Sequence, residues 1–226
     1  MNIIVFFSGS GTNLEAIIKS QDRFKYNVLA AFTNNPGAKG VSICEKYNIQ
    51  CNILDHNQFS CRKDFDTEIG KFLADFDVDY LILAGYMRIL SEDFVADWQG
   101  QIINIHPSLL PKYPGLNTHQ RVLEAKEEAH GTTIHFVTNE LDSGPIIRQE
   151  SIKIEPTDTQ ESLMKRIKEL ENKIWQQTRL VEYLNQMPVS QLLLPEIEAD
   201  DVIAYATNLP YFDGWQKVIV SSDKDF

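Results

Sequence analysis

The sequence predicts an α/β fold: a Rossmann-like, doubly wound and mostly parallel sheet whose C-terminal part is antiparallel. Three observations lead to this fold class. Short apolar runs alternate with segments of helical spacing, a glycine-rich turn follows the first run, and polar side chains collect where the runs end. Alternating strands and helices are typical of βαβ units, in which parallel strands are joined by right-handed crossovers.

The expected parallel strands are continuous apolar runs, which is typical of strands buried on both faces. They cover residues 3–7, 28–32, 51–54, 80–84 and 102–106. A further strand is expected at residues 132–137. After a tight loop containing Ser143-Gly144-Pro145, we expect residues 146–154 to return as an antiparallel strand.

Helices are expected between these runs. One begins at Thr12, which forms a capping box with Glu15, and two others cover residues 39–47 and 118–125. Ser91 is expected to cap a short helix that runs to residue 98. An aromatic stripe at helical spacing predicts a helix that packs on the core, with Phe65, Ile69, Phe72, Leu73 and Phe76 on one face.

The last expected helix has Asp158 as its N-cap and Glu161 as the partner in a capping box, and it ends at Pro188. Its apolar face carries Leu163, Ile167, Leu170, Ile174 and Val181. Residues 188–226 mix acidic and aromatic residues without clean periodicity and receive no assignment. We therefore expect one domain over residues 1–187, followed by a C-terminal tail.

The organising stretch of the chain is residues 100–115. Its first part is an apolar strand, and three prolines in the next ten residues prevent regular structure. Because side chains alternate faces along a strand, Asn104 and His106 are expected on the same face at the strand's carboxyl end. Ligand crevices of open α/β sheets lie at that edge. A lone histidine there is more often structural, so the other loops decide between the two interpretations.

Composition limits the classes of partner. The formal net charge of −11 argues against non-specific nucleic-acid binding and against docking on an anionic membrane. The three cysteines lack metal-ligand spacing, so we expect free thiols in a reducing compartment and no metal site. Without an evident signal peptide or apolar run of membrane-spanning length, we expect a cytoplasmic protein.

The turn at residues 8–13 lies between the first strand and the first helix, where free N–H groups and the positive end of the helix dipole favour a phosphate. It is not a P-loop, and the dinucleotide-binding fingerprint fails because Leu14 replaces the third glycine. A purely structural turn is an equally good interpretation of this segment alone.

Several motifs, in order, resemble the folate-dependent glycinamide ribonucleotide formyltransferases of purine synthesis. They are Ser8-Gly-Ser-Gly-Thr-Asn-Leu14, Ala84-Gly-Tyr-Met-Arg-Ile-Leu90, Asn104-Ile-His-Pro-Ser-Leu-Leu-Pro-Lys-Tyr-Pro-Gly-Leu-Asn-Thr-His119, His130-Gly-Thr-Thr-Ile-His-Phe-Val137 and Leu141-Asp-Ser-Gly-Pro145. The resemblance covers residues 1–185. It implies the formyltransferase fold, and transfer of the formyl group of the cosubstrate 10-formyltetrahydrofolate to the amine of glycinamide ribonucleotide (GAR). It implies small-molecule partners and a monomer or homodimer.

The resemblance also implies site residues. The catalytic trio falls on Asn104, His106 and Asp142. The N-terminal part of the domain would bind the substrate phosphate and ribonucleotide, and its C-terminal part the folate. The ribonucleotide positions are Gly9, Ser10, Gly11, Thr12, Asn13, Lys168 and Glu171, although Lys168 and Glu171 are equally well read as an ordinary solvated pair. The folate positions are Arg62, Arg88, Ile89, Leu90, Asn104, Asn139, Glu140, Leu141 and Asp142.

Other histidines receive separate expectations. His119 aligns with a site histidine of the family, His135 is either a site residue or structural, and His56 and His130 are expected at the surface. Two positions depart from the family pattern, since Gln101 stands where some relatives have arginine and Asn139 where the residue is often acidic. Either departure is expected to affect affinity and not the class of reaction.

Alternative functions are other formyltetrahydrofolate-dependent enzymes, which act on methionyl-tRNA or an amino-sugar nucleotide, or hydrolyse the folate. The tRNA enzyme is expected to be longer and basic, and the hydrolase to carry a regulatory domain. A non-catalytic or redox nucleotide-binding module is a different class, which the failed fingerprint at Leu14 disfavours. A serine hydrolase lacks support because the sequence has no Gly-x-Ser-x-Gly elbow.

Overall fold

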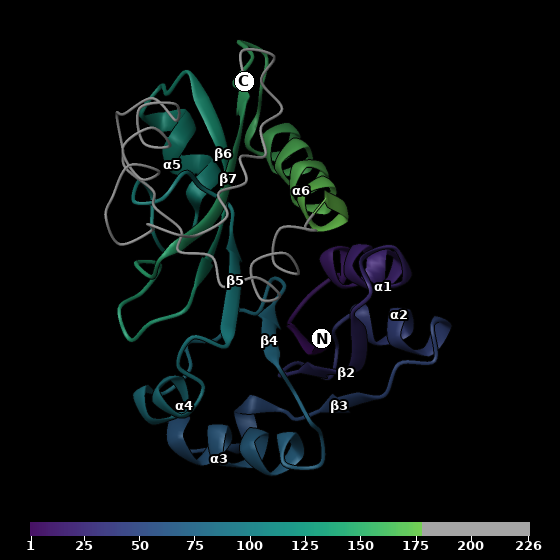
Figure 1. The fold of residues 1–226 in the computed structure, drawn as a ribbon. Coiled ribbons are helices and arrows are strands. Elements are labelled where there is room, and N and C mark those ends of the chain that lie inside the picture. Colours follow the sequence, from purple (N-terminus) through teal and green to yellow (C-terminus); the bar gives the residue numbers. More distant parts are fainter. Residues whose placement is uncertain (178–226) are drawn as a thin grey trace, which may run out of the picture. The chain divides into compact units, whose positions relative to one another are not determined.

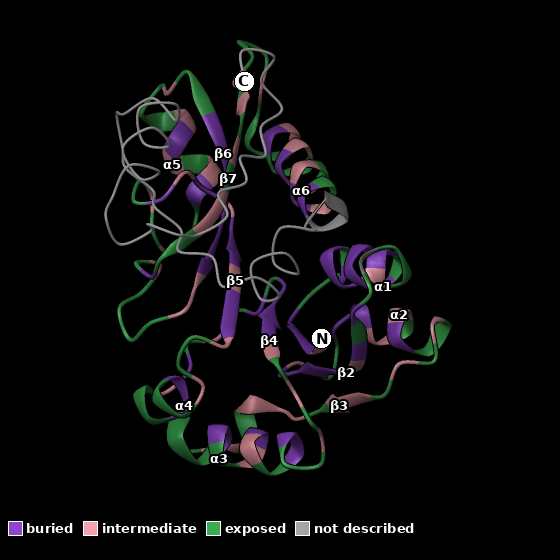
Figure 2. Ribbon diagram, in the orientation of Figure 1, coloured by how far each residue is buried: buried purple, intermediate pink, exposed green. Residues whose placement is uncertain are grey.

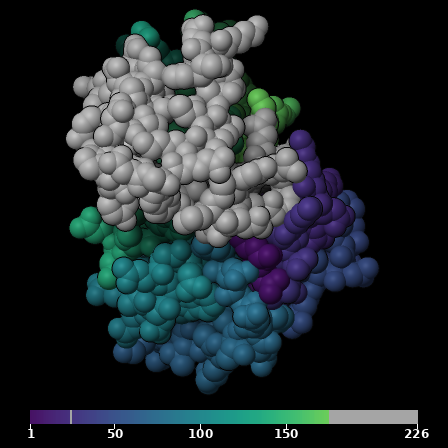
Figure 3. All heavy atoms as spheres, viewed as in Figure 1, coloured from purple at the N-terminus to yellow at the C-terminus, as the bar shows by residue number. Residues whose placement is uncertain are grey.

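The computed structural model describes residues 1–177, except for the side chains of Phe24 and residues 175–177. Figure 3 shows the chain in space-filling form, with residues 178–226 in grey. The expectations for Val181, Pro188 and the tail at residues 188–226 lie outside the described residues. None of the helices between residues 1 and 177 is long and apolar enough to cross a membrane.

Seven strands form one sheet in the order β3-β2-β1-β4-β5-β6-β7. The strands are β1 (Asn2–Phe7), β2 (Asn27–Thr33), β3 (Cys51–Ile53), β4 (Tyr80–Leu83), β5 (Ile102–His106), β6 (Ala129–Phe136) and β7 (Ile146–Lys153). The pairs among β1 to β5 are parallel, whereas β6 pairs antiparallel with β5 and β7 antiparallel with β6. The predicted mostly parallel sheet with an antiparallel C-terminal part is confirmed.

Helices cover both faces of this sheet (Figure 1). They are α1 (Thr12–Phe24), α2 (Gly40–Lys46), α3 (Arg62–Leu73), α4 (Glu92–Asp97), α5 (Thr118–Glu124) and α6 (Gln160–Gln177), with a short 3-10 turn η1 (His56–Gln58). Because side chains alternate along β1, Val5 packs with α1, α2 and α6 on one face, and Phe6 packs with α3 and α4 on the other. Figure 2 shows the buried strands between half-exposed helices.

The predicted aromatic stripe of α3 is confirmed as core. Phe65, Ile69 and Phe72 are at most 8% exposed, and Phe32 of β2 lies 6.1 Å from Phe65 between ring centroids. Ser91 caps α4 as expected, since its side chain accepts a hydrogen bond from the Phe94 N–H. This packing fixes the carboxyl ends of β1, β4 and β5, where the predicted site loops begin.

Two predicted helix caps are wrong. Helix α1 has Gly11 as its N-cap and no side-chain capping bond, while Glu15 pairs instead with Lys19 and Lys46. At the start of α6 the reciprocal bonds join Thr159 and Ser162, from the Ser162 N–H to Oγ1 (3.2 Å) and from the Thr159 N–H to Oγ (2.9 Å). The capping box therefore lies one residue after the predicted pair of Asp158 and Glu161.

Candidate functional site

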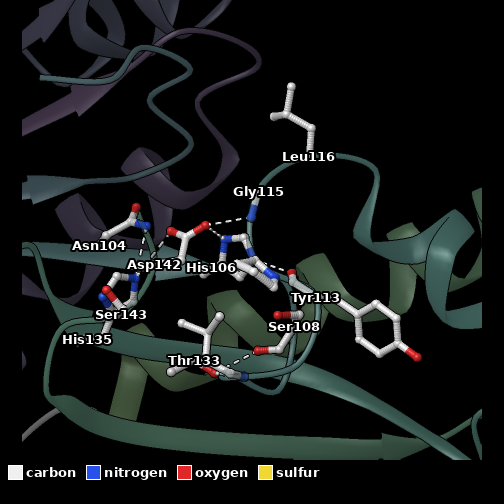
Figure 4. A network of polar contacts seen from close by, with 12 residues as sticks. Asn104, His106, Ser108, Tyr113, Gly115, Leu116, Thr133, His135, Asp142 and Ser143 are labelled. Carbon is white, nitrogen blue, oxygen red and sulfur yellow. Dashed lines mark hydrogen bonds and ion pairs between the residues drawn. The ribbon is translucent and has the colours of Figure 1, made fainter. Parts of the chain in front are cut away.

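His106, the last residue of β5, is held between two acceptors (Figure 4). Its Nε2 lies 3.0 Å from the carbonyl oxygen of Tyr113, and its Nδ1 lies 3.3 Å from Oδ2 of Asp142. The ring is nearly buried, with 7% of the side chain exposed. A carbonyl oxygen cannot donate, so Nε2 carries a proton in this arrangement. Nδ1 faces the Asp142 carboxylate, so both ring nitrogens point at oxygen acceptors.

The loop between β6 and β7 carries Asp142 to this histidine. Asp142 adopts a left-handed backbone conformation with φ of 51°, and its Oδ2 also accepts the Gly115 N–H at 2.8 Å. Gly144 lies so close to β6 that an added Cβ would stand 1.8 Å from the carbonyl oxygen of Phe136. Tyr113 on the other side of the ring also has a positive φ, of 57°. Non-glycine residues adopt this region at an energetic cost and collect at functional sites.

Asn104 lies two residues before His106 on β5, and its side chain contacts His135 of β6. The Asn104 Nδ2 is 3.2 Å from His135 Nε2, and the two residues are direct partners in the β5–β6 pairing. His135 Nδ1 lies 2.9 Å from the Phe136 carbonyl, to which it donates, so Nε2 is the acceptor for the amide. Burial lowers the pKa of His135 and favours this neutral form.

These contacts bring four predicted positions into one network, namely Asn104, His106, His135 and Asp142 (Figure 4). The second carboxylate oxygen of Asp142 lies 3.7 Å from His135 Nε2. One amide hydrogen of Asn104 is used by His135, and the amide has a second. The network can thus present an amide N–H and a charged imidazole N–H at the same strand end, which suits an oxygen that gains negative charge.

The glycine-rich turn leads directly into α1. The first helical hydrogen bond runs from the Glu15 N–H to the Gly11 carbonyl at 2.9 Å, and no side chain caps the helix N-terminus. Gly11 has φ of 73°, and an added Cβ would lie 2.6 Å from the Cα of Gly40. The turn therefore requires glycine here, and uncapped N–H groups at a helix N-terminus are suited to an anion.

Helix α6 adds Glu171 to this region. Glu171 is 5% exposed, its Oε2 accepts a hydrogen bond from Asn13 Nδ2 at 3.0 Å, and burial raises its pKa to about 7. The interpretation of Lys168 and Glu171 as a solvated pair is wrong for Glu171. The Lys168 charge counteracts part of the rise in the pKa of Glu171, so the lysine lies near the same carboxyl group. Among the described residues, Asn13 Oδ1 is buried without a hydrogen-bond partner.

The loop between β4 and α4 holds the predicted folate positions Arg88, Ile89 and Leu90. Leu90 is buried, whereas Ile89 is 53% exposed. The Arg88 guanidinium lies 4.5 Å from the centroid of the Phe65 ring. Buried Asp66 of α3 accepts the Ser91 N–H at 2.5 Å, and exposed Arg62 starts the same helix.

The other predicted folate positions lie before Asp142. Asn139, Glu140 and Leu141 are exposed, and Leu141 is close to Gly115, since an added Cβ there would lie 3.8 Å from Leu141 Cδ2. Four large exposed hydrophobic side chains lie in three loops, Met87 and Ile89 after β4, Leu116 after β5 and Leu141 after β6. Apolar exposure of this kind is typical of ligand-binding surfaces.

The expectation for His130 needs correction. His130 is 1% exposed and not at the surface, because it lies inside β6, which pairs with a neighbouring strand on each side. His119 Nδ1 lies 2.9 Å from His130 Nε2, so the two histidines contact each other. Burial lowers the pKa of both, that of His130 to about 4.

Several contributors were not predicted. The Tyr113 carbonyl and the Gly115 N–H are backbone groups, which residue type does not reveal. Asp66 and Ser8 hold neighbouring loops through buried side chains. The signal for Ser8 in the sequence is its position directly after a strand, whereas Asp66 lies within α3 and has no such signal.

The chain is similar to known proteins both in sequence and in structure. The sequence model of a family described as Formyl transferase matches residues 1–178. A phosphoribosylglycinamide formyltransferase of Escherichia coli is 41% identical over 177 residues, which are 77% of this chain and 84% of that protein. A trifunctional purine biosynthetic protein adenosine-3 of Gallus gallus is 43% identical over 176 residues, and there the match spans 76% of this chain but 17% of the relative's length. A solved phosphoribosylglycinamide formyltransferase from Coxiella burnetii superposes with a TM-score of 0.78 at 39% identity, covering 84% of this chain and 90% of that one.

Proposed function

The chain belongs to the formyl transferase family, in its phosphoribosylglycinamide formyltransferase branch, and we propose that it transfers the formyl group of 10-formyltetrahydrofolate to the amine of GAR. Formyl-GAR and tetrahydrofolate are the products, in de novo purine biosynthesis. One observation carries the proposal: His106 is held between the Tyr113 carbonyl and Asp142, beside Asn104, at the carboxyl end of β5. The relatives disfavour a tRNA, amino-sugar or hydrolytic function and a non-catalytic module.

The chemistry begins with attack of the GAR amine on the formyl carbon, which places negative charge on the formyl oxygen. The free N–H of Asn104 and an N–H of the His106 imidazolium stabilise this oxyanion. Each preorganised donor of this kind contributes on the order of a hundredfold or more in rate. Since Nε2 of His106 points at the Tyr113 carbonyl, donation to the formyl oxygen requires this contact to be exchanged or shared when the folate binds.

Asp142 has two tasks in this scheme. It orients His106 and stabilises the positive charge of the imidazolium, because its Oδ2 faces Nδ1 at 3.3 Å. The attacking amine must also lose a proton, and the nitrogen of the leaving folate must gain one. His106, Asp142 or a water molecule held by them relays this proton, which is general acid–base catalysis usually worth about a hundred- to ten-thousandfold.

The ribonucleotide half of the site lies at α1 and α6. Backbone N–H groups at Gly9, Ser10, Gly11, Thr12 and Asn13 bind the phosphate at the N-terminus of α1, which has no side-chain cap, and Lys168 adds positive charge. Glu171 accepts hydrogen bonds from ribose hydroxyls. Its contact with Asn13 supports this arrangement, because it brings α6 to the last residue of the phosphate-binding turn.

The folate half lies between the loop at Arg88, Ile89 and Leu90 and the loop at Asn139, Glu140 and Leu141. Backbone groups of these loops bind the pterin edge, and the exposed apolar side chains contact its rings. Exposed Arg62 contacts the glutamate tail. The folate is a cosubstrate, and no metal takes part in the proposed scheme. We further propose a cytoplasmic monomer or homodimer whose partners are small molecules and not nucleic acids or membranes.

A transfer assay tests this function. Purified protein is mixed with 10-formyltetrahydrofolate, and deformylated folate is measured with and without GAR. Turnover that depends on GAR is the expected result. Deformylation without GAR would indicate the hydrolase, and no deformylation under either condition would contradict the proposal and direct the search to amino-sugar and tRNA acceptors.

A further inference from the structure

Ser8 lies directly after β1 and is 8% exposed. Its backbone N–H donates to the Gly85 carbonyl at 3.1 Å, and its carbonyl accepts from Asn35 Nδ2 at 3.1 Å. These partners belong to the loops that come after β4 and β2. Ser8 thus contacts two neighbouring loops at the carboxyl edge of the sheet, in addition to beginning the turn between β1 and α1.

The side-chain hydroxyl of Ser8 contacts the same two loops. Its Oγ accepts the Met87 N–H at 2.8 Å and lies 2.5 Å from Oδ1 of Asn34. The oxygen of an amide cannot donate, so the hydroxyl hydrogen points to Asn34 and a lone pair points to Met87. Asn34 is 3% exposed, which fixes the direction of the hydroxyl and therefore the acceptor for Met87.

The two positions joined by Ser8 each adjoin a proposed ligand-binding segment. Gly9 is the next residue after Ser8 and opens the proposed phosphate-binding turn, and Arg88 is the next residue after Met87 and opens the proposed folate-binding segment. The far end of that segment is anchored separately, by Asp66 Oδ2 at 2.5 Å from the Ser91 nitrogen. A movement of the turn that begins at Gly9 is therefore transmitted through the Ser8 hydroxyl to the segment that begins at Arg88, and the reverse also holds.

We propose that Ser8 is a positioning residue that couples the two ligand sites, so that occupation of the phosphate-binding turn strengthens binding of the folate. The inference rests on the proposed function, because that function supplies the two ligands. Coupling is reciprocal, so folate strengthens ribonucleotide binding by the same factor. Removing the hydroxyl leaves the Met87 N–H without its acceptor. The backbone bond from the Ser8 N–H to the Gly85 carbonyl remains, so the link that is lost is the one directly beside Arg88.

Calorimetric titration measures this coupling directly. The probe is 5,8-dideazafolate, which carries no formyl group and cannot react, titrated into the full chain with and without saturating GAR. We expect GAR to tighten binding in the wild type by about fivefold or more. For Ser8→Ala we expect about tenfold weaker binding of the folate, and a tightening factor close to one.

Two variants separate positioning from general damage. Ser20→Ala removes another buried hydroxyl, which donates to the Ala16 carbonyl within α1, and it should leave affinity and coupling unchanged. Asp66→Ala removes the acceptor of the Ser91 N–H, which is the other anchor, and should weaken folate binding while GAR still tightens it. Should Ser8→Ala unfold, Ser8→Thr keeps the oxygen atom and is expected to retain the coupling, and a folded Ser8→Thr without coupling would contradict the proposal.

The outcomes distinguish this inference from the function on which it rests. A wild-type protein that binds neither probe contradicts the proposed function, and the coupling with it. A wild type that binds both probes without mutual strengthening, or a Ser8→Ala variant with unchanged tightening, overturns the role of Ser8 and leaves the function intact.

Discussion

Replacing Glu171 by glutamine tests the buried carboxyl group of the ribonucleotide half. Burial raises the pKa of Glu171 from 4.5 to about 7, so the folded chain keeps a proton that the unfolded chain loses within this range. The contribution of Glu171 to the free energy of unfolding therefore falls as the pH rises from 4.5 to 7. A difference of about 2.5 between the pKa values corresponds to about 3 kcal/mol at neutral pH.

Glutamine is neutral at every pH and retains an oxygen to accept the Asn13 amide N–H, so Glu171→Gln should lose this dependence. Below pH 4.5 the two proteins should have similar stability, and above pH 7 the variant should be more stable by about 3 kcal/mol. Urea unfolding followed by circular dichroism across this range measures the difference. Glu161→Gln, exposed in the first turn of α6, is the matched control. A difference between wild type and Glu171→Gln that does not change with pH would refute the reasoning.

Other changes have equally definite expected results. Asp142→Asn should nearly abolish turnover in the transfer assay while circular dichroism shows an intact fold, because the imidazolium loses its counter-charge; substantial activity would contradict this role. Asn104→Ala should lower kcat by about a hundred- to a thousandfold, with binding of 5,8-dideazafolate measured in parallel, and an unchanged kcat would remove the amide from the proposed oxyanion site. Gly144→Ala places a Cβ against a carbonyl of β6 and should lower the free energy of unfolding by about 1–3 kcal/mol. The control Gly70→Ala, in α3, places its Cβ in open space and should be neutral or stabilising. Equal effects of the two variants in urea unfolding would count against the close approach of Gly144 to β6. Thr159→Ala should cost about 1 kcal/mol in the same experiment through the lost cap of α6, and no loss would show that the capping box is dispensable.

The strands and helices were predictable because apolar periodicity reports burial. The run at residues 102–106 matches β5, and the stripe that includes Phe65 and Phe72 forms the packed face of α3. Caps were less predictable, because several polar residues at each helix start fit the same pattern. Thr12 fits a capping box with Glu15, yet the helix begins with an uncapped turn that leaves its N–H groups free.

The site was predictable in its members but not in their contacts. Asn104, His106 and Asp142 come together as the motifs imply, but the roles of the Tyr113 carbonyl and the Gly115 N–H depend on backbone direction. Glu171 shows a different limit. It belongs to a charged pattern on α6, but α6 packs against α1, where Asn13, 158 residues away in the sequence, donates to it.

The pairing of β5 with β6 has a consequence for how the site tolerates change. Asn104 faces His135 because the two are direct partners across antiparallel strands, and a slip of one residue would turn His135 to the opposite side of the sheet. The distance between the Asn104 amide and the His135 imidazole is thus set by the backbone pairing of β5 with β6. Insertions between α5 and β6 that leave this pairing unchanged would lengthen the loop without moving the side chains of Asn104 and His135.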